Sequence, residues 1–179
     1  MKEIEIKAKL RDKKTVMQKL ESLGCKFEPK ITQEDIVYVE NVGSVEIYNA
    51  NKAVLRLRVK NGKKVLFTAK KKTKNGLEAI EYEVEVSSRD EMEKALLLMG
   101  LQEAVRINKT RIITHYDGCE ICIDDVENLG AFIEMEKLVE DGDALTIQEE
   151  LFQFFEKIDI SRDDRVMVGY DILMLSKNK

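Results

Sequence analysis

Hydrophobic and polar residues alternate along most of this chain, which is the pattern of β-strands that bury one face. Asn61-Gly62 and Asp117-Gly118 each lie between two alternating segments, and such dipeptides favour tight hairpin turns. Asn75-Gly76 predicts a third, longer connection. The alternation predicts strands at residues 2–10, 34–40, 54–60, 64–71, 79–86, 105–114, 119–124 and 131–138.

Three segments instead repeat apolar residues at helical spacing, which predicts helices over residues 12–23, 89–99 and 144–157. Ser88 and Glu91 form a capping box at the start of the second segment. Each predicted helix follows a predicted strand, so helices are expected to flank the sheet.

Two segments, residues 41–53 and 159–169, follow neither period, and we expect them to be loops. No Gly/Ser-rich linker divides the chain, and a length of 179 residues suits one domain. We therefore expect a single α+β domain over residues 1–179.

Charged residues make up 36% of the sequence, but the formal net charge is only −4. The bulk charge therefore predicts no binding to nucleic acid or to a membrane surface. No segment approaches the roughly 18 apolar residues that span a bilayer, and the first residues lack the apolar core of a signal peptide. We expect a cytoplasmic protein with no nucleic-acid or membrane partner.

The three cysteines are expected to be reduced thiols. Cys119 and Cys122 form a CxxC pair, a spacing that can bind metal or carry redox chemistry. They lie in a segment with strand character, however, where residues i and i+3 point to opposite faces, and no second pair completes a zinc site. We interpret them as buried small side chains.

The polar faces of the predicted strands are sorted by charge. Residues 2–10 and 131–138 carry acidic groups on one parity, whereas residues 54–60, 64–71 and 105–114 carry basic groups. Each face alone is explained by contact with water. Together they are consistent with a barrel whose charged faces look inward, where acidic strands need a cation and basic strands an anion. A metal-bound polyphosphate supplies both, and carboxylate ligation favours Mg²⁺ or Mn²⁺.

Several motifs in the chain resemble those of one family. Glu3-x-Glu5-x-Lys7 is similar to the N-terminal signature of the CYTH family, the triphosphate tunnel metalloenzymes. The other matching motifs follow in family order and are Leu55-Arg56-Leu57-Arg58, Thr68-Ala69-Lys70, Lys109-Thr110-Arg111 and the run from Asp124 to Glu136 that contains Leu129-Gly130. The resemblance spans nearly the whole chain, and it implies an eight-stranded antiparallel β-barrel, or tunnel, with a charged interior flanked by helices.

The same resemblance implies roles for individual residues, with Mg²⁺ or Mn²⁺ as the cofactor. The implied catalytic residues are Glu5, Lys7 and Glu136. The implied metal ligands are Glu3, Glu5, Asp124, Glu134 and Glu136. The implied triphosphate-binding residues are Lys7, Lys9, Arg56, Arg58, Lys70, Lys109 and Arg111. Three further charges could belong either to the site or to ordinary strand pairing and surface, namely Glu81, Glu83 and Lys72.

Near the end of the sequence, Tyr170-Asp171-Ile172-Leu173 resembles a closing family element in which Gly169 stands where Ser is usual. Contacts from that end of the chain are therefore an open point. His115 is the only histidine, which argues against a histidine general base and favours a structural role for it.

The resemblance leaves two enzymatic functions open. A class IV-type adenylate cyclase converts ATP to cyclic AMP and pyrophosphate, whereas a triphosphatase hydrolyses thiamine triphosphate, nucleoside triphosphate or inorganic triphosphate. The compact order and the Leu-Gly-x-Phe-x-Glu-x-Glu match favour the cyclase. A non-catalytic module that binds polyphosphate or nucleotide is a third reading. A strand edge or helix stripe could also form a homodimer, for which the sequence carries no discriminating signal.

Overall fold

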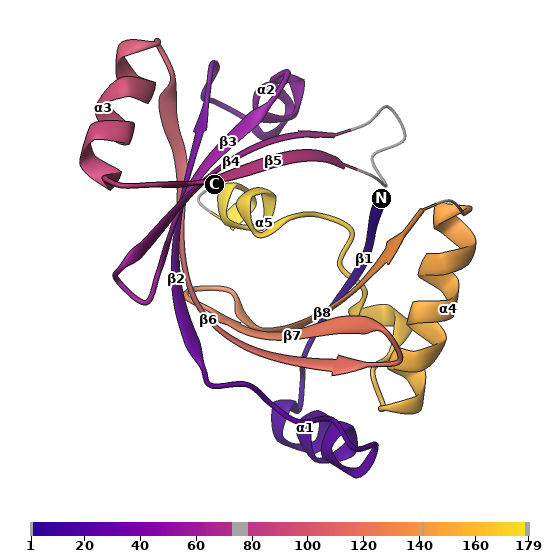
Figure 1. Ribbon diagram of the computed structural model, residues 1–179. Helices are drawn as coiled ribbons and strands as arrows, with labels where there is room; N and C mark the ends of the chain where they lie inside the picture. The colour runs from indigo at the N-terminus through magenta and orange to yellow at the C-terminus, as the bar shows by residue number, and fades with distance from the viewer. Residues whose placement is uncertain (1, 73–78, 141, 178–179) are drawn as a thin grey trace. The chain divides into compact units, whose positions relative to one another are not determined.

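The computed structural model describes residues 2–72, 79–140 and 142–177. Its antiparallel strands are hydrogen-bonded to one another in the order β1-β8-β7-β6-β2-β3-β4-β5. The strands are β1 (Lys2–Lys9), β2 (Ile31–Val39), β3 (Val54–Lys60), β4 (Lys64–Lys72), β5 (Ala79–Val86), β6 (Gln102–Tyr116), β7 (Cys119–Val126) and β8 (Gly130–Val139). The helices are α1 (Lys13–Ser22), α2 (Val45–Ala50), α3 (Arg89–Leu98), α4 (Ala144–Lys157) and α5 (Tyr170–Lys177) (Figure 1). The predicted α+β class with an antiparallel sheet is confirmed.

The chain groups into two compact units. The first unit comprises Met1–Lys30 and Thr110–Met167, and the second comprises Ile31–Lys109 and Val168–Lys179. Strand β6 contributes to both, because its first half belongs to the second unit and its second half to the first.

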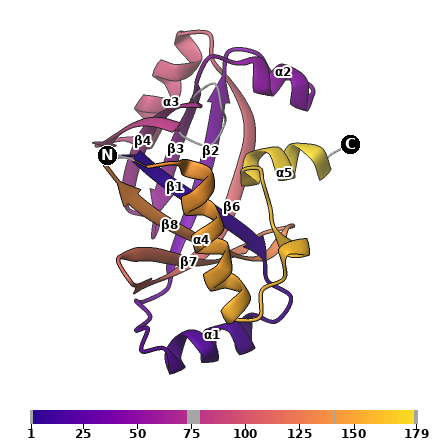
Figure 2. The ribbon, with the colours of Figure 1, turned by 90° about the vertical axis from the view of Figure 1, so that its right-hand side faces the viewer.

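In the first unit, helices α1 and α4 supply the apolar cover of the strands. The apolar residues of α4 recur at helical spacing, so they share one face of the helix. On that face, Phe152 and Phe155 are fully buried in one apolar cluster with Ile6 of β1 and Ile133 of β8. Helix α4 packs on β1, and the two elements cross in Figure 2. The apolar face of β1 is thereby buried. Glu5 and the residues two positions away from it therefore lie on the other face.

The outer edge of β1 is covered by backbone and side-chain groups of the same unit. The Val166 amide donates to the Lys7 carbonyl at 2.8 Å, and Ala8 and Arg165 form an isolated β-bridge. From α4, Gln148 Nε2 donates to the Glu5 carbonyl at 3.0 Å. These contacts satisfy backbone groups that an edge strand otherwise leaves open.

In the second unit, α3 covers the apolar parity of β2 and β3. Leu96 of α3 is fully buried with Ile36, Tyr38 and Leu57. The Ser88 half of the predicted capping box is confirmed, since the Ser88 side chain accepts a hydrogen bond from the Glu91 amide at 3.3 Å, whereas the Glu91 carboxylate accepts from Lys94 at 2.8 Å. As a result, the opposite parity of these strands is the one that carries the charged side chains.

The structure differs from the predicted elements at three short helical segments. The prediction of a loop over residues 41–53 is wrong, because α2 forms one and a half turns there, capped by Ser44 and anchored by the buried Tyr48. A helix this short has no measurable apolar period. Helix α5 forms over a segment for which the sequence predicts no helix, and a single 3₁₀ turn, Arg162–Asp164, interrupts the predicted loop at 159–169.

The predicted hairpin turns are borne out by backbone angles. Asn61 and Gly62 have φ of 51° and 64°, and Asp117 and Gly118 have φ of 48° and 74°. Asn, Asp and Gly tolerate this left-handed conformation best. The third predicted connection, at Asn75-Gly76, lies outside the described residues.

Among the described residues, none of the helices has the length and hydrophobicity needed to cross a membrane.

Candidate functional site

One polar face of the first unit gathers the acidic residues of β1 and β8. The antiparallel register places Glu5 opposite Glu136 and Lys7 opposite Glu134. In β7, the next strand, Glu120 lies on the other side of Glu136. Facing partners in an antiparallel pair point to the same side of the sheet. We call this set the acidic face, and its members are Glu3, Glu5, Glu120, Glu134 and Glu136.

Two cations are embedded in the acidic face. Lys7 is only 6% exposed, and its Nζ lies 3.0 Å from Glu134 Oε1 and 4.0 Å from Glu5 Oε1. Arg111 from β6 forms a bidentate pair with the fully buried Asp124, with distances of 2.7 and 2.6 Å, and also contacts Glu134. Burial alone would lower the pKa of Arg111, but the hydrogen bonds and charges of Asp124 and Glu134 raise it, so Arg111 is a permanent cation.

Glu136 sits in the most crowded part of the acidic face. Burial of its carboxyl raises the pKa to about 7, and the charges of Glu3, Glu120 and Glu5 contribute in the same direction. The charge of Arg111 opposes this shift without cancelling it. The row from Glu5 through Glu136 to Glu120 therefore has an excess of negative charge that the side chains of this unit do not neutralise.

A polar face of the second unit gathers basic residues from three strands. We call it the basic face, and its members are Arg56, Arg58, Lys70 and Lys109. Arg58 is held in a buried bidentate pair with Asp35 of β2, with both distances 2.6 Å. Burial alone would raise the pKa of Asp35, but the hydrogen bonds and charge of Arg58 hold it below its usual range. Arg58 is thus neutralised within its own unit.

Arg56 differs from Arg58 because its charge is not fully matched. Its Nη2 donates to Thr68 Oγ1 at 3.1 Å and lies 3.6 Å from Glu83 Oε2. Its Nε is buried and has no hydrogen-bond partner. Burial and the neighbouring charge of Arg58 both lower the pKa of Arg56. A buried guanidinium with an open donor is a site that an anion would satisfy.

The other members of the basic face have local partners. Lys70 Nζ lies 2.5 Å from Glu81 Oε1 on the neighbouring strand. Lys109 is only 6% exposed, and its Nζ lies 4.9 Å above the ring of Tyr170. Glu81 and Glu83 therefore pair with basic strands, as one of the two sequence interpretations held. The side chain of Lys72, the third open candidate, lies outside the described part of the structure.

The pattern that defines the CYTH domain matches residues 1–170 of this sequence. A Methanocaldococcus jannaschii protein named "Putative adenylate cyclase" is 33% identical over 172 residues, which cover 95% of this chain and 97% of the relative. The chain belongs to the CYTH family.

Solved structures extend the comparison with this CYTH protein. The PH1819 protein from Pyrococcus horikoshii superposes with a TM-score of 0.81 and 28% identity, over 98% of this chain and 99% of that one. A protein from Hippeastrum, described as a "putative adenylyl cyclase" that reveals a dominant triphosphatase activity, superposes with a TM-score of 0.59 and 16% identity, over 94% and 91% of the two chains. At that identity the Hippeastrum protein shows a shared fold alone.

CYTH proteins depend on divalent metal, and the donor chemistry of the acidic face fits such an ion. Glu5 and Glu120 flank Glu136 on the two neighbouring strands, and burial together with the charges of Glu3, Glu120 and Glu5 raises the pKa of Glu136. Carboxylate oxygens are the ligands that Mg²⁺ and Mn²⁺ prefer. Within residues 2–72, 79–140 and 142–177, no three acidic, histidine or cysteine side chains are already arranged as a closed ligand set. Some of these side chains would have to turn toward an ion.

Two residues of this CYTH chain were missed by sequence reasoning. Glu120 shares the parity of Asp124, but its place beside Glu136 depends on the pairing of β7 with β8. Asp35 directly follows Gln33 and Glu34 in the sequence, and its burial against Arg58 depends on the pairing of β2 with β3.

The CxxC pair is buried, as predicted from the sequence, and the single histidine is exposed. His115 is 60% exposed, with its Nε2 3.8 Å from Glu120 Oε2. Cys119 and Cys122 are buried free thiols in β7, as is Cys25 elsewhere in the same unit. Burial raises the pKa of the Cys122 thiol, which keeps it protonated and unreactive.

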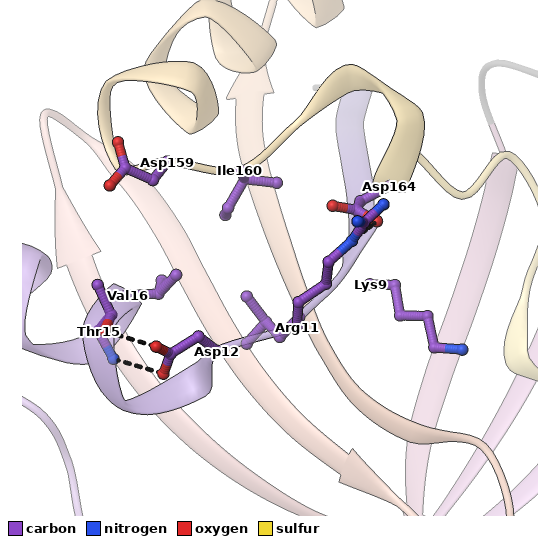
Figure 3. A pocket seen from close by; sticks show the side chains of 9 residues that line it. Lys9, Arg11, Asp12, Thr15, Val16, Asp159, Ile160 and Asp164 are labelled. Carbon is purple, nitrogen blue, oxygen red and sulfur yellow. Dashed lines mark hydrogen bonds and ion pairs between the residues drawn. The ribbon is translucent and has the colours of Figure 1, made fainter.

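A small pocket of the first unit lies where β1 meets α1, beside Lys9, the last predicted phosphate ligand (Figure 3). The polar side chains at this pocket form hydrogen bonds and an ion pair with nearby groups. Asp12 accepts from the Thr15 amide at 3.0 Å and from its hydroxyl at 2.7 Å, and Arg11 Nε lies 2.8 Å from Asp164 Oδ1. Lys9 is exposed, and its side chain extends away from Asp12 and Thr15. The pocket is therefore a structural junction.

Proposed function

We propose that this CYTH protein is a metal-dependent enzyme of the class IV adenylate cyclase type, which converts ATP to cyclic AMP and pyrophosphate. The observation that carries the proposal is the row of carboxylates at Glu5, Glu136 and Glu120, whose excess negative charge calls for a cation. The name of the Methanocaldococcus jannaschii relative supports the cyclase as the specific activity.

In this proposal the acidic face holds the metal ion. The carboxylates of Glu3, Glu5 and Glu136 hold Mg²⁺ or Mn²⁺, with Asp124 and Glu134 as further ligands. A divalent ion bound there supplies charge neutralisation at the phosphoryl oxygens. Because Asp124 and Glu134 also hold Arg111, they contribute to the site through the position of that cation as well.

The basic groups bind the triphosphate. Arg56 offers its open Nε to a phosphate oxygen, and Lys7, Lys70 and Lys109 supply further positive charge. Arg58 and Arg111 act differently, because each is already held by a bidentate carboxylate. They stabilise developing negative charge as fixed cations, and they gain little from moving to the substrate.

The chemical step joins the ribose O3′ of ATP to the α-phosphorus. The bond from the α-phosphorus to its bridging oxygen breaks, pyrophosphate leaves, and the proton of the 3′-hydroxyl passes to solvent. A carboxylate of the acidic face orients the hydroxyl by accepting its hydrogen bond, while the fixed cations stabilise the departing charge. Glu5, Lys7 and Glu136 are the proposed catalytic residues.

A triphosphatase uses the same groups on a different phosphorus. Water attacks the terminal phosphorus of ATP, thiamine triphosphate or inorganic triphosphate, the bond from that phosphorus to its bridging oxygen breaks, and the diphosphate leaves as orthophosphate forms. The triphosphatase activity described for the Hippeastrum protein of the same fold supports this alternative. No residue of the two faces reads an adenine ring by its chemistry, so this alternative is tested alongside the cyclase.

Product analysis tests the proposal. Purified protein is incubated with Mg²⁺ or Mn²⁺ and, separately, with ATP, thiamine triphosphate and inorganic triphosphate. Cyclic AMP plus pyrophosphate supports the cyclase, and orthophosphate alone supports the triphosphatase. A matched pair of variants tests the site, since Glu136→Gln should lose turnover while Glu91→Gln, at an exposed position on α3, should not. Binding without any turnover would leave only the non-catalytic module.

A further inference from the structure

Helix α5 of the second unit begins with a turn that carries three consecutive residues of interest. Gly169 precedes the helix, and Tyr170 and Asp171 form its first turn. Tyr170 lies under Lys109 of the basic face, with the Lys109 Nζ 4.9 Å from the ring centroid. Both side chains are buried, at 7% and 6% exposure. The start of α5 thus contacts one of the proposed phosphate-binding lysines.

The position of this turn is fixed by a tyrosine of α2. The hydroxyl of Tyr48 donates to Asp171 Oδ2, and α2 and α5 pack against each other. Tyr48 is only 3% exposed. Its burial raises the pKa of the phenol, and the charge of Asp171 raises it further, so Tyr48 stays protonated and donates at all ordinary pH values.

Gly169 explains why the Asp171 carboxylate can reach Tyr48. A Cβ atom added at residue 169 would lie 2.2 Å from Asp171 Oδ1 and 3.3 Å from its carboxyl carbon. The carboxylate therefore occupies the space that any other residue at position 169 would fill.

We propose that Gly169, Asp171 and Tyr48 form a clamp that holds the start of α5 so that Tyr170 positions Lys109 for triphosphate binding. The clamp consists of one hydrogen bond and the missing side chain that makes room for it. Its residues are positioning residues, because none of them contacts the substrate in this proposal. The binding consequence rests on the proposed function, whereas the placement of Lys109 does not.

Two single variants break the clamp in different ways. Tyr48→Phe removes the donor and keeps the buried ring, and Gly169→Ala displaces the acceptor while adding one methyl group. Asp171→Asn is the conservative control, since its amide oxygen still accepts from Tyr48. Tyr82→Phe is the matched tyrosine control, because Tyr82 is 73% exposed on β5.

The first readout is the reactivity of the Lys109 amine. Each protein is treated with an amine-acetylating ester without ligand, and acetylation rates are measured by peptide mass spectrometry. Loss of one buried hydrogen bond should raise the Lys109 rate by about fivefold in Tyr48→Phe and in Gly169→Ala. Lys94, which is 70% exposed, should react at an unchanged rate in every protein and so exclude general unfolding.

The second readout is the affinity for inorganic tripolyphosphate with Mg²⁺, measured by calorimetry. Both clamp variants should bind about fivefold more weakly, and both controls should match the parent. The double variant should bind no more weakly than either single variant, because both changes break the same contact.

The two outcomes separate the clamp from the proposed function. An unchanged Lys109 acetylation rate in both single variants would overturn the clamp, whatever the binding data show. A parent protein that binds no tripolyphosphate would instead contradict the proposed function, and the acetylation rates would still decide the clamp.

Discussion

Glu5 of β1 and Glu136 of β8 face each other directly in the antiparallel register, although both side chains are acidic. Like charges at such facing positions destabilise a sheet. A third glutamate, Glu120, flanks Glu136 on the opposite side. The arrangement is unfavourable for the chain alone, and it becomes favourable when a cation is shared between the carboxylates. The carboxylates that would share a cation therefore destabilise the sheet when no cation is bound.

We predict that Glu136→Gln stabilises the metal-free protein at pH 8 and lowers turnover by about 100-fold or more. Folding raises the pKa of Glu136 from 4.5 to about 7. A raised pKa favours the folded state fully below about pH 4.5, and this contribution is lost as the pH rises through about 7. The free energy of unfolding of the variant should exceed that of the parent by on the order of 2 kcal/mol at pH 8.

Urea denaturation in EDTA at pH 5 and pH 8 measures this difference. Little difference between the two proteins is expected at pH 5, where the parent carboxyl is largely protonated. A variant that is less stable than the parent at pH 8 would show that Glu136 is not in a negatively charged surrounding.

We predict that Asp35→Ala destabilises the protein by about 3–5 kcal/mol, because it leaves the buried Arg58 without its partner. The double replacement Asp35→Leu with Arg58→Met should recover most of this loss, since neither charge is then buried. Equilibrium unfolding of the three proteins gives the comparison. If the double variant is as unstable as the single one, the ion pair contributes more than mutual neutralisation.

The same pair predicts sensitivity to acid. Because the pKa of Asp35 is lowered on folding, its contribution is present above its ordinary pKa near 4 and is lost as the pH falls further. The parent should therefore lose stability below about pH 4, and the Asp35→Leu, Arg58→Met variant should lose less. Circular dichroism at pH 6 and pH 3 checks this.

We predict that Arg56→Met weakens tripolyphosphate binding by about tenfold or more while leaving the free protein as stable as the parent or more so. Arg56 is buried next to Arg58, and its Nε has no partner, so removing its charge relieves repulsion. The matched control is Arg89→Met, because Arg89 also has a buried Nε without a partner but lies outside the basic face. Equal loss of affinity in both variants would contradict the role of Arg56.

We predict that Gln148→Leu costs about 1–3 kcal/mol and reduces turnover. Gln148 donates to the Glu5 carbonyl and accepts from Arg165 at 3.1 Å, so a leucine leaves both groups unsatisfied. Hydrogen exchange by mass spectrometry should show faster exchange in β1 of the variant. Exchange as slow as in the parent would mean that other contacts fix this edge.

The polar and apolar faces could be predicted from the sequence because the side-chain period of a strand is two. The parity of Glu5 and Lys7, and that of Arg56 and Arg58, follows from counting alone once each strand is recognised. Boundaries came out within a few residues for most strands, and α4 was predicted with its observed bounds.

The partners of those residues could not be predicted in the same way. Whether Glu5 faces Glu136 depends on the register between strands that are far apart in the sequence. The neutralisation of Arg58 by Asp35 likewise depends on the pairing of β2 with β3. Motif comparison named the charged residues, but only the register shows which charges remain unmatched.

The division of the first unit into two sequence segments has a consequence for how the chain is made. Strand β1 pairs with β8, and its edge is completed only when Val166 and Arg165 arrive. During synthesis, β1 leaves the ribosome long before these partners do, whereas β2 to β5 are contiguous and can pair at once. The part of β1 that packs against α4 must therefore wait until α4 is made, after β2 to β5. The strand that carries Glu5 is among the first to be synthesised and among the last to be completed.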